Sequence, residues 1–210
     1  VCEIVQLVLP IARDKIIDTT KVASCHEQSF TTLAYQRATQ VLYFTDRRDS
    51  TQYALYKKEL LTGLISKLTS PVKQGQGDHF IDLNLQQDHL LIVRDSYWAN
   101  TDFISFNLAT EKEQLLNSIA AYYYTAFWGS DGESVWHNMG NEKVIAYQPK
   151  TQKSVTLLST SFGWNYNTKP LNAHTLIFNV SDANGGDLIL WQDGKLFVNE
   201  TSHSEFLPAI

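Results

Sequence analysis

The chain has 210 residues, of which 43% are hydrophobic and 19% charged, so it can bury a sizeable core and does not read as a disordered chain. Its net charge is −5 and no run of Lys or Arg exceeds two residues, which argues against nucleic acid as a partner of this segment. No apolar stretch is long enough to cross a bilayer, so we expect any membrane contact to come from outside this chain.

The N-terminal segment, residues 1–28, differs from the rest of the chain. Its apolar residues from Ile4 to Leu9 predict a short strand stopped by Pro10, and residues 11–24 are mixed, with a polar stretch from Asp18 to Lys21. The segment could tether the body to an upstream part, or it could lend its strand to the last repeat and close a ring.

Both cysteines of the chain, Cys2 and Cys25, lie in this segment. A disulfide between them would close a loop of about two dozen residues and stabilise the fold by roughly 3 kcal/mol. Such a bridge implies an oxidising compartment. The alternative is two free, buried thiols; we favour the bridge because the two cysteines are close in sequence and the repeats contain none.

Four short turns recur through residues 29–210. They are Thr62-Gly63, Thr110-Glu111-Lys112, Thr151-Gln152-Lys153 and Asp193-Gly194-Lys195, and they follow one another at steps of 48, 41 and 42 residues (62 to 110, 110 to 151, 151 to 193). A period in the forties with several strands per unit is typical of a β-propeller. We therefore predict an all-β domain of four four-stranded antiparallel blades, either a small ring or part of a larger propeller.

Each unit contains four candidate strands in chain order. Unit one has Thr31–Tyr35, Gln40–Thr45, Gln52–Lys57 and Leu64–Leu68; unit two has Phe80–Leu85, His89–Arg94, Asp102–Asn107 and Glu113–Leu116; unit three has Ala121–Trp128, Ser134–Asn138, Lys143–Gln148 and Ser154–Leu158; unit four has Gly163–Asn167, Thr175–Val180, Asp187–Trp191 and Lys195–Val198.

Two windows also fit amphipathic helices. The apolar spacing within residues 57–68 and 111–123 matches one helix face, and Thr110 with Glu113 resembles a capping box. The matching positions of units three and four, Ser154–Leu157 and Leu196–Val198, are rich in β-branched or aromatic residues or too short for a helix. We therefore predict strands in both windows.

The loops that join second and third strands share one face of a propeller, so their residues can form a common binding surface. We take candidate binding residues from these loops. Tyr97 and Trp98 fall in a predicted loop over Asp95–Thr101, and exposed aromatic side chains often form contact surfaces. Trp98 could instead fold back over its own blade. Arg47 and Arg48 could bind a carboxylate, or they could form ion pairs with neighbouring aspartates.

The inner strands supply further aromatic candidates, Trp128 and Trp164, which could bind a sugar or an apolar ligand on the channel side or belong to the core between blades. No nucleophile elbow, phosphate-binding loop or metal-ligand spacing is present, so we predict no catalytic residue, metal or cofactor. Ser130-Asp131-Gly132 with Trp136 is a single echo of the turn repeated in sialidase-type propellers.

Unit one, the first of the four repeats, resembles the repeat of TolB-like and WD-type propellers. An apolar strand, Leu42-Tyr43-Phe44, ends in Thr45-Asp46-Arg47-Arg48-Asp49, and a Tyr-containing strand, a Thr62-Gly63 turn and Lys67-Leu68-Thr69 follow. The match is partial in the other units. Similar repeats form the extracytoplasmic sensor part of CadC-like, membrane-anchored transcriptional regulators, and a cysteine pair at the start of that part would suit the arrangement.

Together these features predict a non-enzymatic sensor or interaction domain in the periplasm or another extracytoplasmic compartment. The resemblance implies that it is part of a membrane-anchored transcriptional regulator and binds a protein or a small ligand on the loop face. The alternative is the accessory propeller of a peptidase, or a degenerate glycosidase.

Overall fold

The computed structural model describes residues 3–8, 18–24, 32–48, 51–72, 75–97, 100–120, 126–139, 143–159, 164–172, 175–182, 185–192 and 195–199. Every regular element in these ranges is a β-strand, which confirms the all-β prediction. None of these residues forms a helix long and apolar enough to span a membrane.

Four antiparallel sheets of four strands form the blades, and in each blade the strands follow one another in chain order. Blade 1 has β3 (Leu33–Gln36), β4 (Val41–Asp46), β5 (Ala54–Glu59) and β6 (Ile65–Lys67); blade 2 has β7 (Gly77–Leu83), β8 (His89–Tyr97), β9 (Asn100–Asn107) and β10 (Lys112–Ile119); blade 3 has β11 (Ala126–Trp128), β12 (Val135–Met139), β13 (Lys143–Gln148) and β14 (Lys153–Ser159); blade 4 has β15 (Trp164–Asn172), β16 (Thr175–Asp182), β17 (Gly185–Gln192) and β18 (Lys195–Asn199). A separate two-stranded sheet pairs β1 (Glu3–Val8) with β2 (Asp18–Ser24).

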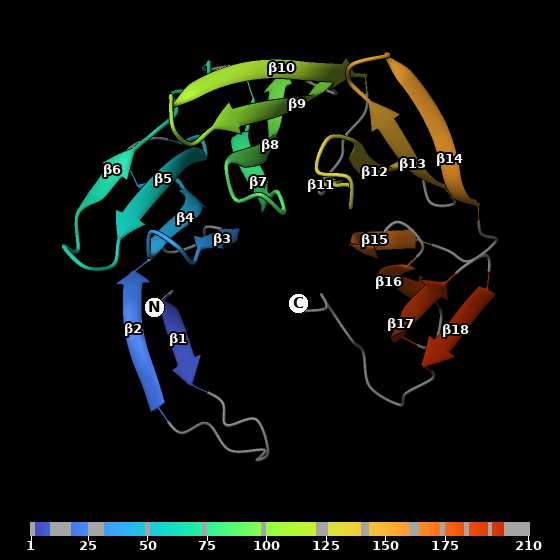
Figure 1. Cartoon of the computed structure of the whole chain (residues 1–210), viewed down its shortest axis with the longest axis horizontal. Helices are drawn as coiled ribbons and strands as arrows, with labels where there is room; N and C mark the ends of the chain where they lie inside the picture. Colours follow the sequence, from blue (N-terminus) through green and yellow to red (C-terminus); the bar gives the residue numbers. More distant parts are fainter. Residues whose placement is uncertain are drawn as a thin grey trace.

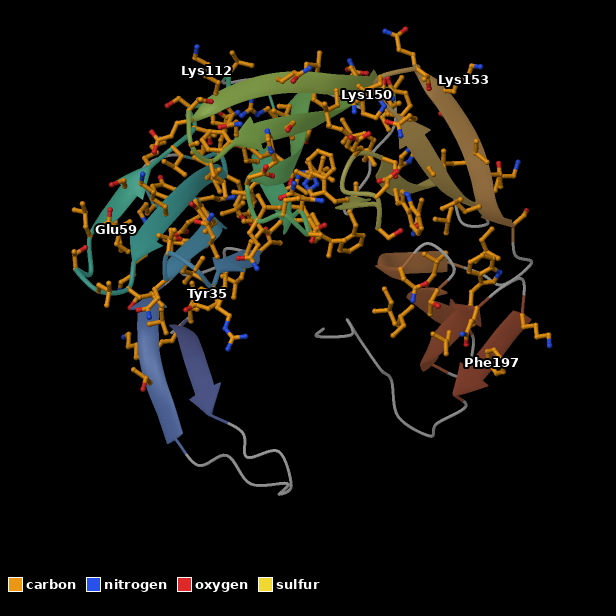
Figure 2. The ribbon with its side chains drawn as sticks, viewed as in Figure 1. Tyr35, Glu59, Lys112, Lys150, Lys153 and Phe197 are labelled. Atoms are coloured by element: carbon orange, nitrogen blue, oxygen red, sulfur yellow. The ribbon has the colours of Figure 1, made fainter. Side chains whose placement is uncertain are left out.

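The blades follow one another around a common centre in a four-bladed propeller arrangement (Figure 1). The first strand of each blade lies nearest the centre and the fourth lies at the perimeter. Side chains of the fourth strands, such as Lys112, Lys153 and Phe197, project at the outer rim (Figure 2).

The recurring turns join the third and fourth strands of the blades. Their left-handed residues are Gly63, with a φ of 74°, Glu111, with a φ of 53°, and Gln152, with a φ of 55°. A short hairpin needs a residue with positive φ at this point, which explains why the turns recur in sequence. The two windows that also fitted helices contain the strands β6 and β10.

The loop predictions are wrong in two blades. The expected loop over Asp95–Thr101 is mostly strand, because β8 extends to Tyr97, whose Cα partner is Asn100. In blade 4, β16 and β17 likewise leave residues 183–184 as their connection, where a loop over Ser181–Gly186 was expected. Polar residues at strand ends satisfy their backbone groups by pairing as readily as apolar ones do, so polarity alone overestimates loop length.

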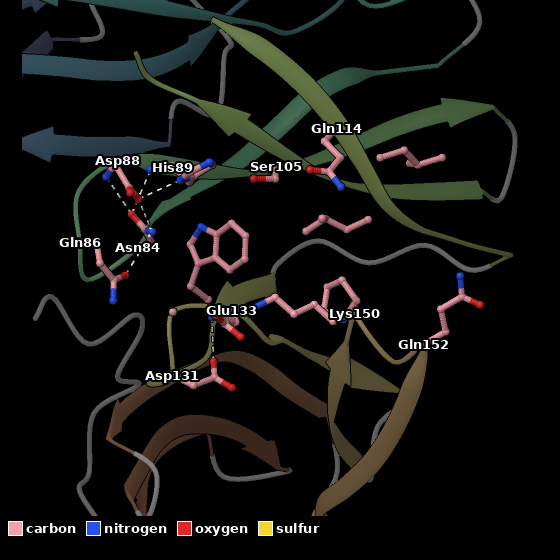
Figure 3. A pocket seen from close by; sticks show the side chains of 15 residues that line it. Asn84, Gln86, Asp88, His89, Ser105, Gln114, Asp131, Glu133, Lys150 and Gln152 are labelled. Carbon is pink, nitrogen blue, oxygen red and sulfur yellow. Dashed lines mark hydrogen bonds and ion pairs between the residues drawn. The ribbon is translucent and has the colours of Figure 1, made fainter. Parts of the chain in front are cut away.

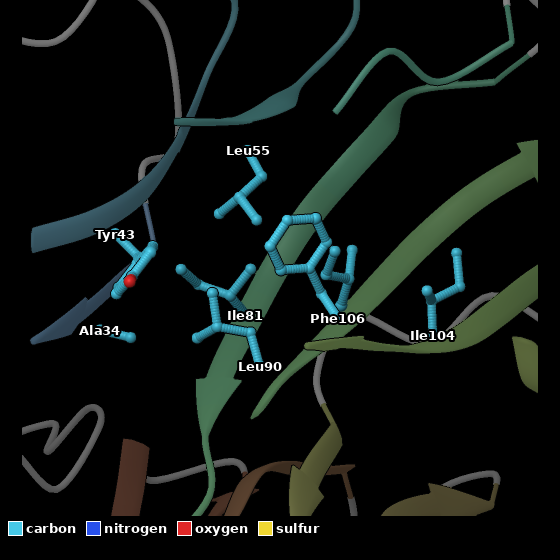
Figure 4. Packing of buried hydrophobic residues seen from close by; sticks show 8 residues of the cluster. Ala34, Tyr43, Leu55, Ile81, Leu90, Ile104 and Phe106 are labelled. Atoms are coloured by element: carbon cyan, nitrogen blue, oxygen red, sulfur yellow. The ribbon is translucent and has the colours of Figure 1, made fainter. Parts of the chain in front are cut away.

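Blades 1 to 3 bury apolar side chains on both faces because side chains alternate along a strand. In β8, Leu90 and Ile92 face blade 1, whereas Leu91 and Val93 face blade 3, and all four are fully buried. Figure 4 shows the first of these interfaces, where Leu55 of blade 1 packs with residues of blade 2. Burying each such side chain stabilises the fold by about 1.5–3 kcal/mol.

The sheet of β1 and β2 covers the other face of blade 1. Ile4 packs with Leu42, Phe44 and Tyr56 of that blade. The polar stretch Asp18–Lys21 forms part of β2 in register with β1. The N-terminal segment therefore takes the place that a neighbouring blade occupies elsewhere in the arrangement.

A charged network lies within blade 2. The carboxylate of Asp78 is fully buried and accepts hydrogen bonds from Thr69 and from Arg94, and Arg94 also donates to Glu113 in two bonds of 2.8 Å. Burial raises the pKa of Asp78, against the lowering effect of Arg94 and Thr69. Burial also lowers the pKa of Arg94, but hydrogen bonds to Glu113 and Asp78 raise it by more, so the guanidinium stays charged.

We predict that replacing Arg94 by Met lowers the free energy of unfolding by about 3–5 kcal/mol, because it leaves the carboxyl of Asp78 buried without its main partner. Urea unfolding measures the change. Lys57→Met is the matched control: its 2.6 Å ion pair with Glu111 is partly exposed and contributes less than about 1 kcal/mol. Equal effects of the two substitutions would contradict this account.

Candidate functional site

A pocket of about 630 Å³ lies between blades 2 and 3 (Figure 3). Blade 2 contributes residues of the β7–β8 connection, Ser105 of β9 and Gln114, Leu115 and Leu116 of β10. Blade 3 contributes Trp128 of β11 and residues of the β11–β12 and β13–β14 turns. This volume is in the range of small-molecule sites.

The β7–β8 connection is held in place by Asn84. Its Oδ1 accepts hydrogen bonds of 3.0 Å from the backbone N–H groups of Asp88 and His89, and its Nδ2 donates to Oδ1 of Asp88 at 2.7 Å and to Oε1 of Gln86 at 3.2 Å. The loop therefore presents a fixed carboxylate and an amide side chain to the pocket.

The imidazole of His89 fixes the Asp88 carboxylate further. Its Nε2 lies 3.0 Å from Nδ2 of Asn107, and the Oδ1 of that amide already accepts two backbone N–H groups. Because Nδ2 is a donor, Nε2 accepts, and Nδ1 donates to Asp88 at 2.8 Å. The hydrogen bonds from His89 and then Asn84 lower the pKa of Asp88.

The β11–β12 turn is organised by Asp131. Its Oδ1 accepts from the backbone N–H groups of Glu133 (2.9 Å) and Ser134 (2.8 Å) and from the hydroxyl of Ser134 (2.8 Å). Burial raises the pKa of Asp131, but these hydrogen bonds outweigh it and the pKa is lowered. Its other oxygen, Oδ2, has no hydrogen bond within the described part of the chain.

Only glycine fits at the start of this turn. A Cβ at Gly129 would lie 2.1 Å from Oγ of Ser134 and 2.5 Å from Nε1 of Trp136, which itself donates to that hydroxyl at 2.8 Å. Gly132 has a φ of 69°, and a Cβ there would lie 2.5 Å from Oε1 of Gln86. The two loops that flank the pocket therefore meet across the boundary between the blades.

Trp128 joins the pocket to the core. Its side chain is 7% exposed and packs with Leu91, Val93 and Phe103, and its backbone N–H donates to Oδ2 of Asp82 at 2.9 Å. Its indole N–H is buried and has no hydrogen-bond partner among the described residues. An unpaired buried donor costs about 1–3 kcal/mol, so a native fold that keeps one calls for an explanation.

The pocket is electronegative. Asp88, Asp131 and Glu133 line it, against the cation of Lys150, and Nζ of Lys150 is held by Glu133 at 2.7 Å. Because the pKa values of Asp88 and Asp131 are lowered, both are anions at neutral pH. No group of three or more metal-ligating side chains occurs within the described ranges.

The predicted arginines lie at the opposite end of the blades from the pocket. Arg48 pairs with the buried carboxylate of Asp46 at 3.0 Å, donates to the carbonyl of Ser24 in β2, and lies over the rings of Phe44 and Tyr56. Its contacts bind the N-terminal sheet to blade 1.

Arg47 lies 4.1 Å above the ring of Tyr53, and its Nε is buried without a partner among the described residues. Oδ1 of Asp95, at the same end of the blades, is also buried and unpaired there. This end of the blades therefore also has buried polar atoms that make no hydrogen bond among the described residues.

The structure does not bring the predicted aromatic residues together as one described cluster. Trp128 lines the pocket as well as the core between the blades. Tyr97 ends β8 and Trp164 begins β15, but the placement of their side chains is not described. Trp98 and both cysteines, Cys2 and Cys25, lie outside the described residues.

Sequence reasoning missed most of the pocket. The sequence pointed to Asp131 through a single copy of the turn motif of sialidase-type propellers. It pointed to Trp128 because an aromatic ring can bind a ligand. Gln114 and Lys150 belong to no motif, and Gln152 was noted only as part of a recurring turn. Gln114 meets the other two only through the packing of blade 2 against blade 3.

Comparison with known proteins supports the fold. No family model and no curated protein matches the chain. Among solved structures, TolB from Acinetobacter baumannii matches with a TM-score of 0.66 at 14% identity, over 85% of this chain and 44% of that one. A protein assigned to TolB from Agrobacterium tumefaciens gives 0.69 at 12% identity, over 88% and 70%.

An oligogalacturonate lyase from Vibrio parahaemolyticus is also similar, with a TM-score of 0.59 at 16% identity, over 97% of this chain and 61% of that one. The chain thus spans less than half of the Acinetobacter TolB structure and about three fifths of the lyase. These likenesses establish a TolB-like β-propeller fold.

His137 is a buried titratable side chain at the boundary between blades 2 and 3. It is 6% exposed, its ring centroid is 5.0 Å from that of Phe103, and its Nδ1 donates to the carbonyl of Asn138 at 3.1 Å. Burial lowers the pKa of His137, against the raising effect of that hydrogen bond.

We predict that stability falls as the pH drops from about 6.5 to the pKa of folded His137, by up to about 1.4 kcal/mol per pH unit. In this window the unfolded chain binds a proton that the folded chain excludes. His137→Phe removes the titrating group, so urea unfolding at several pH values gives a shallower slope for the variant. The same slope in both proteins would contradict the prediction.

Proposed function

We propose that this chain is a non-enzymatic binding module, a β-propeller that holds a small ligand or a segment of a partner in the pocket between blades 2 and 3. The observation that carries the proposal is the pocket itself, which measures about 630 Å³ between two blades and is lined by polar side chains that Asn84 and the β11–β12 turn hold in place.

The acid–base properties of the pocket support binding rather than hydrolysis. A general acid for glycoside cleavage needs a carboxyl with a raised pKa. The pKa values of Asp88 and Asp131 are lowered instead, and Oδ1 of Asp131 is occupied by three donors of its own turn.

Within a longer protein we propose that the module is the extracytoplasmic sensor part of a membrane-anchored transcriptional regulator. The repeat of unit one and the TolB-like fold support this role. The alternative, an accessory propeller of an enzyme, is favoured by the likeness to oligogalacturonate lyase.

The loop end of the blades remains a second proposed location for the binding site. Tyr97 and Trp98 lie there in the chain, and Arg47 and Asp95 keep unpaired atoms at the same end. The pocket is preferred because its volume and lining are defined by described residues.

A pair of matched substitutions tests the location. Gln114→Phe places a bulky ring in the pocket from β10, and Val155→Phe places the same ring on β14, where Val155 is 61% exposed and does not line the pocket. Ligand-observed NMR with a panel of neutral oligosaccharides, uronic-acid oligomers, amino acids, polyamines and short peptides measures binding.

We predict that Gln114→Phe weakens binding at least about tenfold, which corresponds to about 1.4 kcal/mol, and that Val155→Phe leaves it unchanged. A Tyr97→Ala, Trp98→Ala double variant should also bind normally. Loss in the double variant alone would move the site to the loop end. No binding of any panel member by the wild-type protein, or conversion of a bound member into product, would overturn the proposed function.

The extracytoplasmic location rests on a disulfide, which is tested separately. Cys2 directly precedes Glu3 and Cys25 directly follows Ser24, and Glu3 and Ser24 are Cα partners in the ladder of β1 and β2. If the ladder continues by one residue, the cysteines face each other at a separation suited to a disulfide.

We therefore predict no free thiol in the unfolded, unreduced protein and two after reduction, as measured with a thiol-reactive chromophore. Finding two free thiols before reduction would remove the argument for an oxidising compartment.

A further inference from the structure

We infer that Asn107 is a positioning residue for the pocket between blades 2 and 3, although it is not part of the pocket lining. Its amide determines which ring nitrogen of His89 carries the proton, and His89 in turn holds the carboxylate of Asp88 in the lining. We call these three side chains the relay. The relay is a property of the fold, whereas its value for binding rests on the proposed function.

The orientation of the Asn107 amide is fixed by the β9–β10 turn. Its Oδ1 accepts hydrogen bonds from the backbone N–H groups of Ala109 at 3.0 Å and Thr110 at 2.8 Å, and from the hydroxyl of Thr110 at 3.0 Å. A backbone N–H can only donate, so exchanging the oxygen and the nitrogen of the amide would set donor against donor. Nδ2 is therefore the atom that lies 3.0 Å from Nε2 of His89.

The proton of the His89 ring follows from this orientation. An amide Nδ2 has no acceptor capacity, so Nε2 must accept and cannot carry a proton. The hydrogen bond made by one ring nitrogen decides the state of the other, and Nδ1 is left to donate to Oδ1 of Asp88 at 2.8 Å. His89 and Asn107 are Cα partners in the ladder of β8 and β9, so the sheet itself brings them together.

The last contact of the relay fixes what the pocket offers a ligand at this corner. Oδ1 of Asp88 accepts from His89 and, at 2.7 Å, from Nδ2 of Asn84 (Figure 3). The hydrogen bond from His89 and then that from Asn84 lower the pKa of Asp88. His89 also lines the pocket, but both of its ring nitrogens are engaged, so the polar group presented there is an ordered carboxylate and not an imidazole.

Other charged groups lie close to the relay but make no described bond with His89. The lining includes three from blade 3, which are Asp131, Glu133 and Lys150. Glu111, in the turn that Asn107 holds, pairs with Lys57 of blade 1 at 2.6 Å. The proton of His89 is thus set by its two hydrogen-bond partners, Asp88 and Asn107.

Nitrogen-15 NMR of the unmodified full chain tests the relay, because the shift of a ring nitrogen shows whether it carries a proton. At about pH 8, where an exposed imidazole is neutral, we expect Nδ1 of His89 to be protonated and Nε2 to be bare. His89→Gln identifies the signals among the six histidines, and sequential assignment does so independently. A proton on Nε2 in the wild-type protein would overturn the inference without any variant having to fold.

Asn107→Asp tests the first contact by exchanging one atom. The new side chain keeps an oxygen for the β9–β10 turn and places a second oxygen, in place of Nδ2, against Nε2. Each ring nitrogen then faces a carboxylate, so the ratio of doubly to singly protonated ring should rise at least about tenfold at the same pH.

Asn117→Asp is the matched control. It adds the same charge to β10, where Oδ1 of Asn117 accepts from the N–H of Ser118, and it lies outside the pocket lining. We expect it to leave the His89 ring as in the wild type. An unchanged ring in Asn107→Asp, or an equal change in the control, would show that Asn107 does not set the proton.

His89→Leu tests the second contact through the carbon-13 resonances of the carboxyl groups. Loss of the hydrogen bond from His89 should raise the pKa of Asp88 toward that of an ordinary aspartate. Asp131 serves as the internal control, because its donors belong to Glu133 and Ser134 of its own turn and its pKa should not move. An unmoved pKa of Asp88 would break the relay at this contact.

These measurements use no ligand, so they separate the inference from the proposed function. A wrong tautomer or an unmoved Asp88 disproves the relay and leaves the binding pocket in place. A relay that is found in a protein that binds no member of the panel shows that the proposed function is wrong, and with it the positioning role of Asn107.

Discussion

The structure depends on the burial of both faces of blades 1 to 3. A four-stranded sheet with apolar side chains on both sides is stable only between two neighbours, and β8 shows the requirement most clearly: Leu90 and Ile92 belong to one interface, and Leu91 and Val93 to the other. The same requirement places the sheet of β1 and β2 on the free face of blade 1, where Ile4 packs with Phe44 and Tyr56. With the faces committed to packing, binding is left to the ends of the blades and to the seams between them.

Much of this architecture could be predicted from the sequence because it comes from a repeated local signal. The turns around Gly63, Glu111 and Gln152 recur since each closes a hairpin with a residue of positive φ, and counting them gives the blades. The same reasoning overestimated the loops because it equated polar residues with irregular structure. Asp95 is buried and paired within the ladder opposite Thr101, so the chain around Tyr97 is a strand end and not a long loop.

The candidate site was harder to predict because its residues are brought together by tertiary packing alone. Asn84, Gln114, Trp128 and Lys150 lie in four segments of two blades, and no spacing in the sequence relates them. Their arrangement around one volume exists only in the folded chain. The aromatic ring of Trp128 was visible as a candidate, but the state of its indole N–H was not.

The two ends of the blades use their charges differently, which bears on where a ligand is recognised. At the loop end, the contacts of Arg48 are structural: its guanidinium binds Asp46, the backbone of β2 and two aromatic rings. Displacing this guanidinium would weaken the contact between the N-terminal sheet and blade 1. At the pocket end, Asp88 and Asp131 are each anchored through one oxygen and keep the other. An anchored group with a spare acceptor is preorganised for a ligand, because the fold has already met the cost of ordering it. In the proposed function a ligand in this seam would contact both blade 2 and blade 3, so its binding would add to the stability of the contact between them.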